Sequence, residues 1–240
     1  MRKYISEVRP PKISVVMPAL NEEANIAQAI NSCLAAFSQY GLKGEIVVVD
    51  DGSQDKTKEV VKAIMRAEER IRLIIHPAPR GIGASFWAGF RGAGGDAVVM
   101  IPGDNENELS QIIRHIGLLR DVDMVVPFVR NKDVRSGWRN LLSGAYTFIL
   151  NATFGMSLKY FNGTVLYKKS LLDNIGCASK GFFFQAEILI KALKNGCLFA
   201  EVPYSIRKRA GGDAKAVSFF SLCDVAGCYL RLITEIGCRR

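Results

Sequence analysis

Short apolar runs alternate with stretches of helical periodicity along the first hundred residues. Four runs are predicted as strands: Ile13–Met17, Ile46–Val49, Ile71–Ile75 and Asp96–Ile101. Their apolar residues are consecutive rather than alternating, which is typical of strands covered on both faces. Apolar residues recur at helical spacing from Ile26 to Phe37, and a second helix is predicted from about Lys56 to Arg70. This order predicts an α/β fold with a mostly parallel central sheet and helices on both faces.

The turn after the first strand carries the signals of a helix start. Pro18 cannot donate to a β-ladder and is expected to end the strand. Asn21 is a favourable N-cap residue, and Glu22 and Glu23 would then lie in the positively polarised first turn. We therefore expect the helix to begin directly after Asn21.

The second predicted strand runs directly into two carboxylates and a glycine turn. Asp50 and Asp51 stand at its carboxyl end, and Gly52 allows a sharp turn. Ser53 or Asp55 can cap the helix that follows. Ligands of open α/β sheets bind outside the carboxyl ends of the strands, so two acids there are placed for a ligand. The alternative is that this segment is only a turn with a cap.

The fourth predicted strand also ends in acids. Asp104 and Glu106 are two residues apart, and a bent loop containing Gly103 can turn both towards one ion. Carboxylate oxygens suit Mg²⁺ or Mn²⁺, so the pair is a candidate metal site. Considered alone, this loop could be an ordinary acidic turn. Two strands of one sheet that are both followed by acids favour a shared ligand site instead.

Glycine motifs for phosphate binding are missing from the expected places. The loop after the first strand reads PALNEE and has no glycine, so neither a dinucleotide fingerprint nor a P-loop is present. Gly81 and Gly83 form a weak match, because Phe86 stands where a third glycine would be needed. If phosphates bind, a metal ion or basic side chains must neutralise them.

Composition narrows the choice of partner and compartment. The 240 residues carry a net charge of +9, which calls for nucleic acid, an acidic membrane face or phosphate-bearing small molecules. No nucleic-acid-binding motif appears, so we expect no nucleic-acid partner. The first residues lack the apolar core of a secretion signal, and the six cysteines form no C-x-x-C pair, which predicts a cytoplasmic protein with reduced thiols.

The second half contains further elements whose roles the pattern leaves open. Asp123–Phe128 reads as a strand, and Leu141–Phe154 is an apolar stretch too short to span a bilayer, which suits a core helix or an interfacial one. Glu187 lies in an apolar helix, where a buried carboxylate needs a salt-bridge partner or has a catalytic role. Apolar residues from Phe219 to Ile233 share one helical face, which suits either a membrane surface or packing against the domain.

Three segments taken in order carry a resemblance to a known family. PALNEEANI, VVVDDGSQDKT and the acidic loop after VVMI resemble the inverting family 2 glycosyltransferases of the GT-A fold, and within them the polyprenyl-phosphate (dolichol-phosphate) mannose or glucose synthases. The resemblance implies a single Rossmann-like domain over residues 1–240. It would have a nucleotide-sugar donor half at about 12–128, an acceptor half at 129–215 and a C-terminal amphipathic helix at 216–240.

The resemblance assigns residues to a GDP- or UDP-sugar donor and to a metal ion, Mg²⁺ or Mn²⁺. The residues that would hold the nucleotide sugar are Pro18, Ala19, Asn21, Glu22, Asp50, Asp51, Gly52, Gly83 and Gly103. Asp104 and Glu106 would hold the metal ion, and Pro102 stands at the first position of the family's usual Asp-x-Asp motif. Asp104, Glu187 and Arg139 are the predicted catalytic residues.

The acceptor is predicted to be a polyprenyl phosphate. The residues at the positions that would bind its phosphate are Arg130, Arg139, Ser143, Arg209 and Lys215. A phosphate monoester is already largely anionic at neutral pH, whereas a hydroxyl acceptor needs a base, and His76 and His115 are both interpreted as structural. A peripheral contact with the inner face of the membrane is expected through the C-terminal helix.

Other functions stay open. A transferase of the same fold could act on a sugar hydroxyl in polysaccharide or lipopolysaccharide synthesis, with Glu187 as the acid considered for its base. A weakened nucleotide-sugar-binding protein, suggested by Pro102, is an alternative of a different class, and a nucleic-acid-binding α/β domain is a more remote one.

Overall fold

The structure, a computed structural model, describes residues 12–134, 137–207 and 219–237. Its strands are β1 (Ile13–Ala19), β2 (Gly44–Asp50), β3 (Ile71–Ile75), β4 (Ala97–Met100), β5 (Met124–Val129), β6 (Leu166–Lys168) and β7 (Phe199–Tyr204). Its α-helices are α1 (Ile26–Gln39), α2 (Thr57–Met65), α3 (Ile82–Gly92), α4 (Ser110–Ile113), α5 (Gly137–Phe154), α6 (Lys169–Asp173), α7 (Phe184–Lys194) and α8 (Phe219–Gly237). Two short 3-10 helices are η1 (Ile116–Arg120) and η2 (Lys132–Val134).

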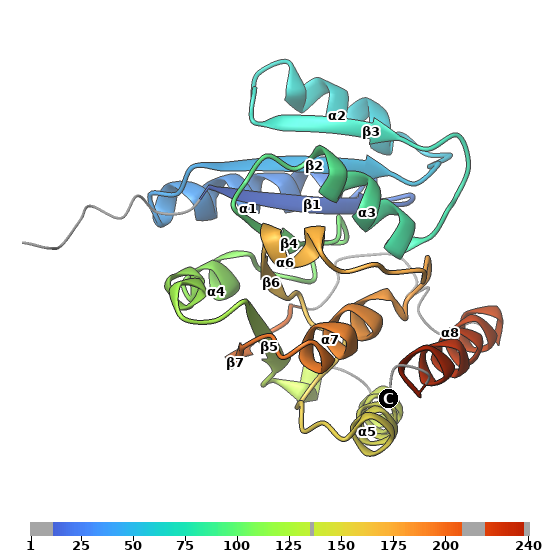
Figure 1. The fold of residues 1–240 in the computed structure, drawn as a ribbon. Helices are drawn as coiled ribbons and strands as arrows, with labels where there is room; N and C mark the ends of the chain where they lie inside the picture. Colours follow the sequence, from blue (N-terminus) through green and yellow to red (C-terminus); the bar gives the residue numbers. More distant parts are fainter. Residues whose placement is uncertain (1–11, 135–136, 208–218, 238–240) are drawn as a thin grey trace, which may run out of the picture.

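The strands form one sheet between two layers of helices. Their order is β3-β2-β1-β4-β6-β5-β7, and every neighbouring pair is parallel except the two that involve β6. Helices α1, α2 and α4 pack on one face, and α3, α5, α7 and α8 pack on the other (Figure 1). The predicted α/β fold with a mostly parallel sheet is confirmed.

Successive residues of the central strands point to opposite faces and divide the core in two. Val15 and Met17 belong to the cluster that α1 covers, whereas Val16 between them belongs to the cluster that α3 and α7 cover. All three side chains are fully buried. Both faces of the strand therefore need apolar residues, which explains the unbroken apolar runs in the sequence.

The carboxyl ends of the parallel strands meet at one edge of the sheet. Ala19 pairs with Asp50, and Asp50 pairs with Ile75, so the chain leaves β1, β2 and β3 side by side. β6 runs antiparallel to β4 and β5, with Leu166 opposite both Val99 and Val125. The beginning of β6 therefore lies at the same edge as the ends of its neighbours, and this is the edge where ligands of open α/β sheets bind.

β1 continues past its predicted stop. Pro18 pairs with Val49, and the strand ends at Ala19. The Pro18 carbonyl accepts a hydrogen bond from the Gly103 amide at 2.9 Å. An N–H at this position would point to the same side of β1, where β4 has already ended at Met100. The proline is therefore tolerated, because its missing N–H removes no hydrogen bond between β1 and β4. The prediction that Pro18 ends the strand is wrong.

α1 begins later than predicted. Its first residue is Ile26, with Asn25 at the N-cap position, whereas Asn21 has a left-handed φ of 55°. Asparagine adopts this conformation more readily than most residues. The prediction of a helix starting after Asn21 is wrong, and Glu22 and Glu23 lie in the loop between β1 and α1.

The two long helices of the second half are placed differently. α5 buries Leu150 and Phe154 but leaves Trp138 and Phe148 largely exposed. α8 packs against the core, which is the interpretation that the sequence left open beside a membrane surface. Within the described ranges, no helix has the length and apolar character needed to cross a bilayer.

Candidate functional site

The loops that follow β1 and β2 are fastened to each other by hydrogen bonds between side chains and backbone. The bonds of this clasp, between 2.8 and 3.0 Å long, run from Asn21 N to Ser53 Oγ, Gln54 N to Asn21 Oδ1, Glu22 N to Thr57 Oγ1, Glu23 N to Asp55 Oδ2 and Lys56 N to Glu23 Oε2. Lys56 is the N-cap residue of α2, so neither Ser53 nor Asp55 takes the predicted cap position; Asp55, one residue earlier, accepts hydrogen bonds from Thr57 N and Oγ1 at the start of the helix. The clasp fixes two loops that carry predicted nucleotide-binding residues.

Asp50 and Asp51 are adjacent at the end of β2 but differ in their hydrogen bonds. Asp51 Oδ1 accepts from His76 Nδ1 at 2.7 Å and from the Arg80 amide at 2.9 Å. Its Oδ2 accepts from the Gly81 amide at 2.9 Å. Asp50 Oδ2 is instead buried with no hydrogen-bond partner in the described part of the chain. Asp51 therefore anchors the loop after β3, His76 has the structural role predicted for it, and Asp50 keeps acceptor capacity.

Two close approaches between backbone segments require glycine near this edge. Gly52 has a φ of 79°, and a Cβ there would lie 2.7 Å from the carbonyl carbon of Ala78. At the start of α3, the Gly83 amide donates to the Lys180 carbonyl at 2.7 Å, and a Cβ would lie 2.8 Å from the same oxygen. Gly83 therefore contacts the loop before α7 rather than open space.

The loop after β4 carries the predicted metal-binding acids and lies against the end of β1. The Gly103 amide donates to the Pro18 carbonyl, and a Cβ at Gly103 would lie 3.2 Å from Ala19 Cβ. Asp104 Oδ1 accepts from the Glu106 amide at 3.0 Å, and both acids are half-buried. The structure thus brings these five predicted site residues together.

The donor chemistry of this loop fits a hard divalent cation. Asp104 and Glu106 supply carboxylate oxygens, while the residues that the structure describes include no group of three or more His, Cys, Asp or Glu side chains that could hold an ion. Mg²⁺ is usually bound through one or two carboxylates, and substrate phosphates and waters complete its coordination. Two acids are therefore a sufficient protein contribution.

The segment after β7 joins the acidic loop to the second half of the chain. The Arg207 amide donates to the Glu106 carbonyl at 2.9 Å, and Asn107 and Ile206 form an antiparallel bridge. The Arg207 guanidinium also forms an ion pair with Glu108. These contacts hold a basic residue beside the candidate metal site.

The ends of β5 and β7 are fixed next to this junction. Arg130 follows β5, and its amide donates to the Tyr204 carbonyl at 2.9 Å. The Asn131 side chain donates to the Ile206 carbonyl at 2.8 Å and accepts from the Ile206 amide at 2.9 Å. The exposed Arg130 side chain, predicted to bind the acceptor phosphate, thus starts from a fixed backbone.

α5 turns its polar side towards the domain. Arg139 and Ser143, also predicted to contact the acceptor phosphate, are half-buried and one turn apart. Thr147 continues this row and donates to the Ser143 carbonyl at 2.9 Å. Asn151 holds the Leu158 backbone by two hydrogen bonds of 2.8 and 3.1 Å. Arg209 and Lys215, the other predicted phosphate ligands, lie outside the described residues.

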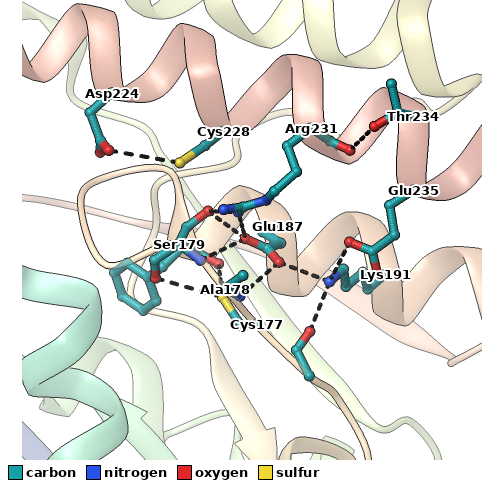
Figure 2. Close-up of polar contacts among 12 residues, drawn as sticks. Cys177, Ala178, Ser179, Glu187, Lys191, Asp224, Cys228, Arg231, Thr234 and Glu235 are labelled. Carbon is teal, nitrogen blue, oxygen red and sulfur yellow. Dashed lines mark hydrogen bonds and ion pairs between the residues drawn. The ribbon is translucent and has the colours of Figure 1, made fainter.

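Glu187 on α7 is the centre of a polar cluster, shown in Figure 2. Its carboxylate is 0% exposed, and it accepts hydrogen bonds from Lys191 Nζ (2.8 Å) and Arg231 Nη2 (3.0 Å). The amides of Ala178 and Ser179 donate to it at 3.0 Å each. Burial raises the pKa of this carboxyl, but the hydrogen bonds from Lys191, Ser179 and Ala178 outweigh burial and lower the pKa to about 2.

This cluster favours a structural role for Glu187 over the catalytic role predicted for it. A fully buried carboxylate whose two oxygens are engaged is not placed to take a proton from an acceptor. Two residues of α8 complete the arrangement: Arg231 also donates to Ser179 Oγ at 2.9 Å, and Glu235 pairs with Lys191 at 3.0 Å. The cluster thus links α8 to α7 and to the loop that precedes α7.

Sequence reasoning missed several residues of this edge. Arg207 lies two residues before the predicted phosphate ligand Arg209, and Asn131 belongs to no motif. The partners of Asp51, such as the Arg80 amide, are backbone groups that no residue pattern reveals. The sequence signal that could have pointed to Arg207 is Glu108, two residues beyond Glu106, because a third acid in the loop suggests a basic partner nearby.

Comparisons with known proteins give a consistent result. A family model described as glycosyl transferase family 2 matches residues 14–188. A low-salt glycan biosynthesis hexosyltransferase of Haloferax volcanii is 27% identical over 217 residues, which cover 87% of this chain and 51% of the relative. An undecaprenyl-phosphate 4-deoxy-4-formamido-L-arabinose transferase of Salmonella paratyphi A is 29% identical over 238 residues, which cover 94% of this chain and 71% of the relative. The chain thus spans about half the length of the first relative.

Solved structures share the fold. Glucosyl-3-phosphoglycerate synthase from Mycobacterium tuberculosis, in complex with Mn²⁺, UDP and glucosyl-3-phosphoglycerate, superposes with a TM-score of 0.68 at 24% identity and covers 93% of this chain and 80% of that protein. The same enzyme with Mg²⁺ and UDP gives a TM-score of 0.70 at 23% identity, with the same coverage. At these identities the likeness establishes the GT-A fold alone.

Proposed function

This chain belongs to glycosyl transferase family 2, and we propose that it transfers a sugar from a nucleotide-sugar donor to a polyprenyl phosphate, with inversion. The observation that carries the proposal is the 2.9 Å bond from the Arg207 amide to the Glu106 carbonyl, which holds the basic residue Arg207 beside the acidic loop. The relative named for undecaprenyl phosphate supports the acceptor class. The structural neighbours that contain UDP with Mn²⁺ or Mg²⁺ support the donor class and the metal.

Asp50 is the acid best suited to the nucleoside part of the donor. A buried carboxylate oxygen without a donor costs free energy, which fits an atom whose partner is supplied by a ligand. Asp51 has no comparable capacity, because three donors already occupy it. We therefore assign Asp51 to holding the loop after β3 and Asp50 to the base or ribose.

Asp104 and Glu106 would hold the divalent ion. A bound Mg²⁺ or Mn²⁺ neutralises the charge that develops on the leaving diphosphate. The chain's own contribution is to fix the two carboxylates: Gly103 holds the loop to β1, and the Glu106 amide orients the Asp104 side chain. These contacts keep the ligands in place before the donor binds, which lowers the cost of reorganisation during the reaction.

The acceptor side is rich in cations, and within its described residues we identify no base for a hydroxyl acceptor. Of the groups considered, Glu187 is fully engaged, His76 is bonded to Asp51, and His115 Nε2 accepts from Arg114. A phosphate monoester needs no deprotonation at neutral pH, because its second pKa is about 6. Its oxygen attacks the anomeric carbon, the new carbon–oxygen bond forms, and the bond to the diphosphate breaks on the opposite face. Arg139 and Arg130 are proposed to position that oxygen.

The donor assignment is tested with metal and nucleotide. We expect the thermal stability of the purified chain to rise with one class of nucleotide sugar, GDP- or UDP-linked, and more so with Mg²⁺ or Mn²⁺ present. Asp104→Ala should abolish transfer, and Glu106→Gln should reduce it more mildly, because an amide oxygen can still ligate a hard cation. Asp173→Ala, an exposed acid on α6, is the matched control. Full activity of Asp104→Ala with metal present would rule out this metal site.

The acceptor assignment is tested with two acceptor classes. A short, water-dispersed polyprenyl phosphate should be glycosylated, whereas a panel of free sugars should not. Arg139→Ala should lose far more turnover than the exposed control Arg66→Ala. Near-normal turnover of Arg139→Ala, together with transfer to a sugar hydroxyl, would instead identify a chain-building transferase of the same fold.

A further inference from the structure

The outward side of α5 is apolar from one end to the other. The α5 apolar face consists of the exposed residues Trp138, Leu141, Leu142, Ala145, Phe148, Ile149 and Ala152. Trp138, Leu141 and Phe148 are 67%, 63% and 73% exposed. Neighbouring members of the face recur at spacings of three, four and seven residues, which places them on one stripe of the helix. A surface helix normally has the reverse arrangement, and a contiguous apolar face marks a contact with another surface.

No neighbouring element covers the α5 apolar face in the described structure. α8 lies beside α5, as Figure 1 shows, and touches its last turns: Thr153 Oγ1 and Tyr229 Oη are 2.7 Å apart, and the Phe154 and Tyr229 rings meet edge to face. These contacts use the flank and the inner side of α5. The described residues leave the exposed side chains of the stripe uncovered.

We propose that the α5 apolar face docks the protein on an anionic membrane surface. The inference rests on the proposed function, because a polyprenyl phosphate acceptor is held in a membrane by its chain. Charge favours this partner: residues 129–159 contain five basic residues and one acidic residue, a net charge of +4. The basic residues are Arg130, Lys132, Arg135, Arg139 and Lys159. Basic segments beside an apolar helical face are attracted to anionic headgroups.

A second copy of the chain is a less suitable occupant for the same face. A helix of 18 residues is about 27 Å long and about 10 Å wide, so its exposed stripe offers about 300 Å². Stable protein interfaces bury about 800 Å² on each partner. A dimer through α5 would also bring two strongly basic segments together, whereas a membrane needs no minimum area and supplies the opposite charge.

The docked orientation serves the proposed reaction. A helix that lies in the interface buries its apolar side by about 5–10 Å into the boundary between headgroups and acyl chains. Arg139 and Ser143 lie on the opposite, half-buried side of the same helix. Docking by the α5 apolar face therefore places these acceptor-binding residues at the depth where a lipid phosphate lies.

The test is co-sedimentation of the full chain with vesicles that contain no polyprenyl phosphate. We expect binding to phosphatidylcholine vesicles that include phosphatidylglycerol, weaker binding without it, and partial release by salt. The double variant Leu141→Ser/Phe148→Ser should reduce partitioning by at least about tenfold. The matched control is Leu230→Ser, a leucine on α8 that is 61% exposed, which should bind as the wild type does.

A second readout locates the contact on the helix. The chain has two tryptophans, and Trp138 is the exposed one, so its fluorescence should shift to the blue when vesicles are added. Trp138→Phe should retain vesicle binding and lose that shift. Unchanged binding of the double variant, or equal loss in Leu230→Ser, would overturn the proposal. So would a wild type that is dimeric without vesicles and a double variant that is monomeric.

The same variants separate this inference from the proposed function. Nucleotide binding and transfer to a short, dispersed acceptor should be unchanged in Leu141→Ser/Phe148→Ser, while transfer to an acceptor embedded in vesicles should fall. Absence of transfer to any lipid phosphate by the wild type would refute the proposed acceptor. Vesicle binding that does not depend on the α5 apolar face would refute the docking surface alone.

Discussion

α5 and α8 are helices of 18 and 19 residues with similarly apolar sequences, yet they meet solvent in opposite ways. α8 turns Cys228 and Leu232 into the core, where they are 7% and 1% exposed. Among the side chains of α8 that the structure describes, Leu230 is the large apolar one left exposed. α5 leaves five large apolar residues exposed and turns its polar row inwards.

Charged residues account for the orientation of α8, whereas the inner side of α5 is partly apolar. Arg231 and Glu235 of α8 reach the buried Glu187 and the half-buried Lys191 of α7, and these contacts fix the rotation of α8 about its axis. The inner side of α5 is mixed: Leu150 and Phe154 are buried there beside half-buried polar residues such as Ser143, while five other large apolar residues lie outside. The orientation of α8 thus depends on charged residues that find partners on α7, whereas α5 has a narrow buried side and a broad exposed apolar one.

The largest expected effect comes from removing the anchor of α8. Glu187→Gln keeps the shape of the side chain but removes the buried charge that Lys191 and Arg231 share. We expect a loss of about 3 kcal/mol in the free energy of unfolding, measured by urea denaturation. Glu235→Gln is the matched control, because its side chain is 30% exposed, and it should cost less than about 1 kcal/mol. A Glu187→Gln variant as stable as the wild type would show that the cluster does not hold α8.

The buried side of α8 gives the next effect. Leu232→Ala removes a side chain that is 1% exposed and leaves a cavity against the core. The free energy of unfolding should fall by about 3 kcal/mol, the usual cost of such a truncation. Leu230→Ala, on the exposed side of the same helix, should change it by less than about 0.5 kcal/mol. Equal costs for the two leucines would contradict the orientation of α8.

Acid should weaken the anchor in a defined range of pH. The pKa of Glu187 is lowered to about 2 from its ordinary value of 4.5, so the folded protein binds this proton less readily than the unfolded chain. The stabilisation is therefore complete above about pH 4.5 and is lost as the pH falls towards 2. We expect the difference in unfolding free energy between the wild type and Glu187→Gln to shrink over this range. A difference that stays constant down to pH 2.5 would mean that Glu187 is not ionised in the folded protein.

The sheet was predictable from the sequence because buried parallel strands leave unbroken apolar runs. α3 and β6 were not predicted. α3 contains several glycines, and a Cβ at Gly89 would lie 2.4 Å from a Val16 methyl group, so glycine there reflects close packing on the sheet rather than a loop. β6 has three residues, too few for a periodic signal.

The candidate site was predictable in its acids and less so in their roles. Asp50, Asp51 and Asp104 were placed at strand ends by the pattern alone, and the structure puts them there. Their different roles depend on partners distant in the sequence, such as the His76 ring that contacts Asp51. The same holds for Glu187, whose partner Arg231 is 44 residues away.

The smallest expected effect is on the exposed side of α5, and it separates stability from binding. Phe148 is 73% exposed, so Phe148→Ala should change the free energy of unfolding by less than about 0.5 kcal/mol, in contrast to Leu232→Ala. Phe154→Ala, on the buried side of the same helix at 4% exposure, should cost about 3 kcal/mol or more in the same urea titration. If Phe148→Ala proved as costly as Phe154→Ala, the face would be covered within the folded chain, because an exposed ring has no intramolecular contacts to lose. A neutral result would confirm that Phe148 is open in the folded chain and available to the proposed membrane contact.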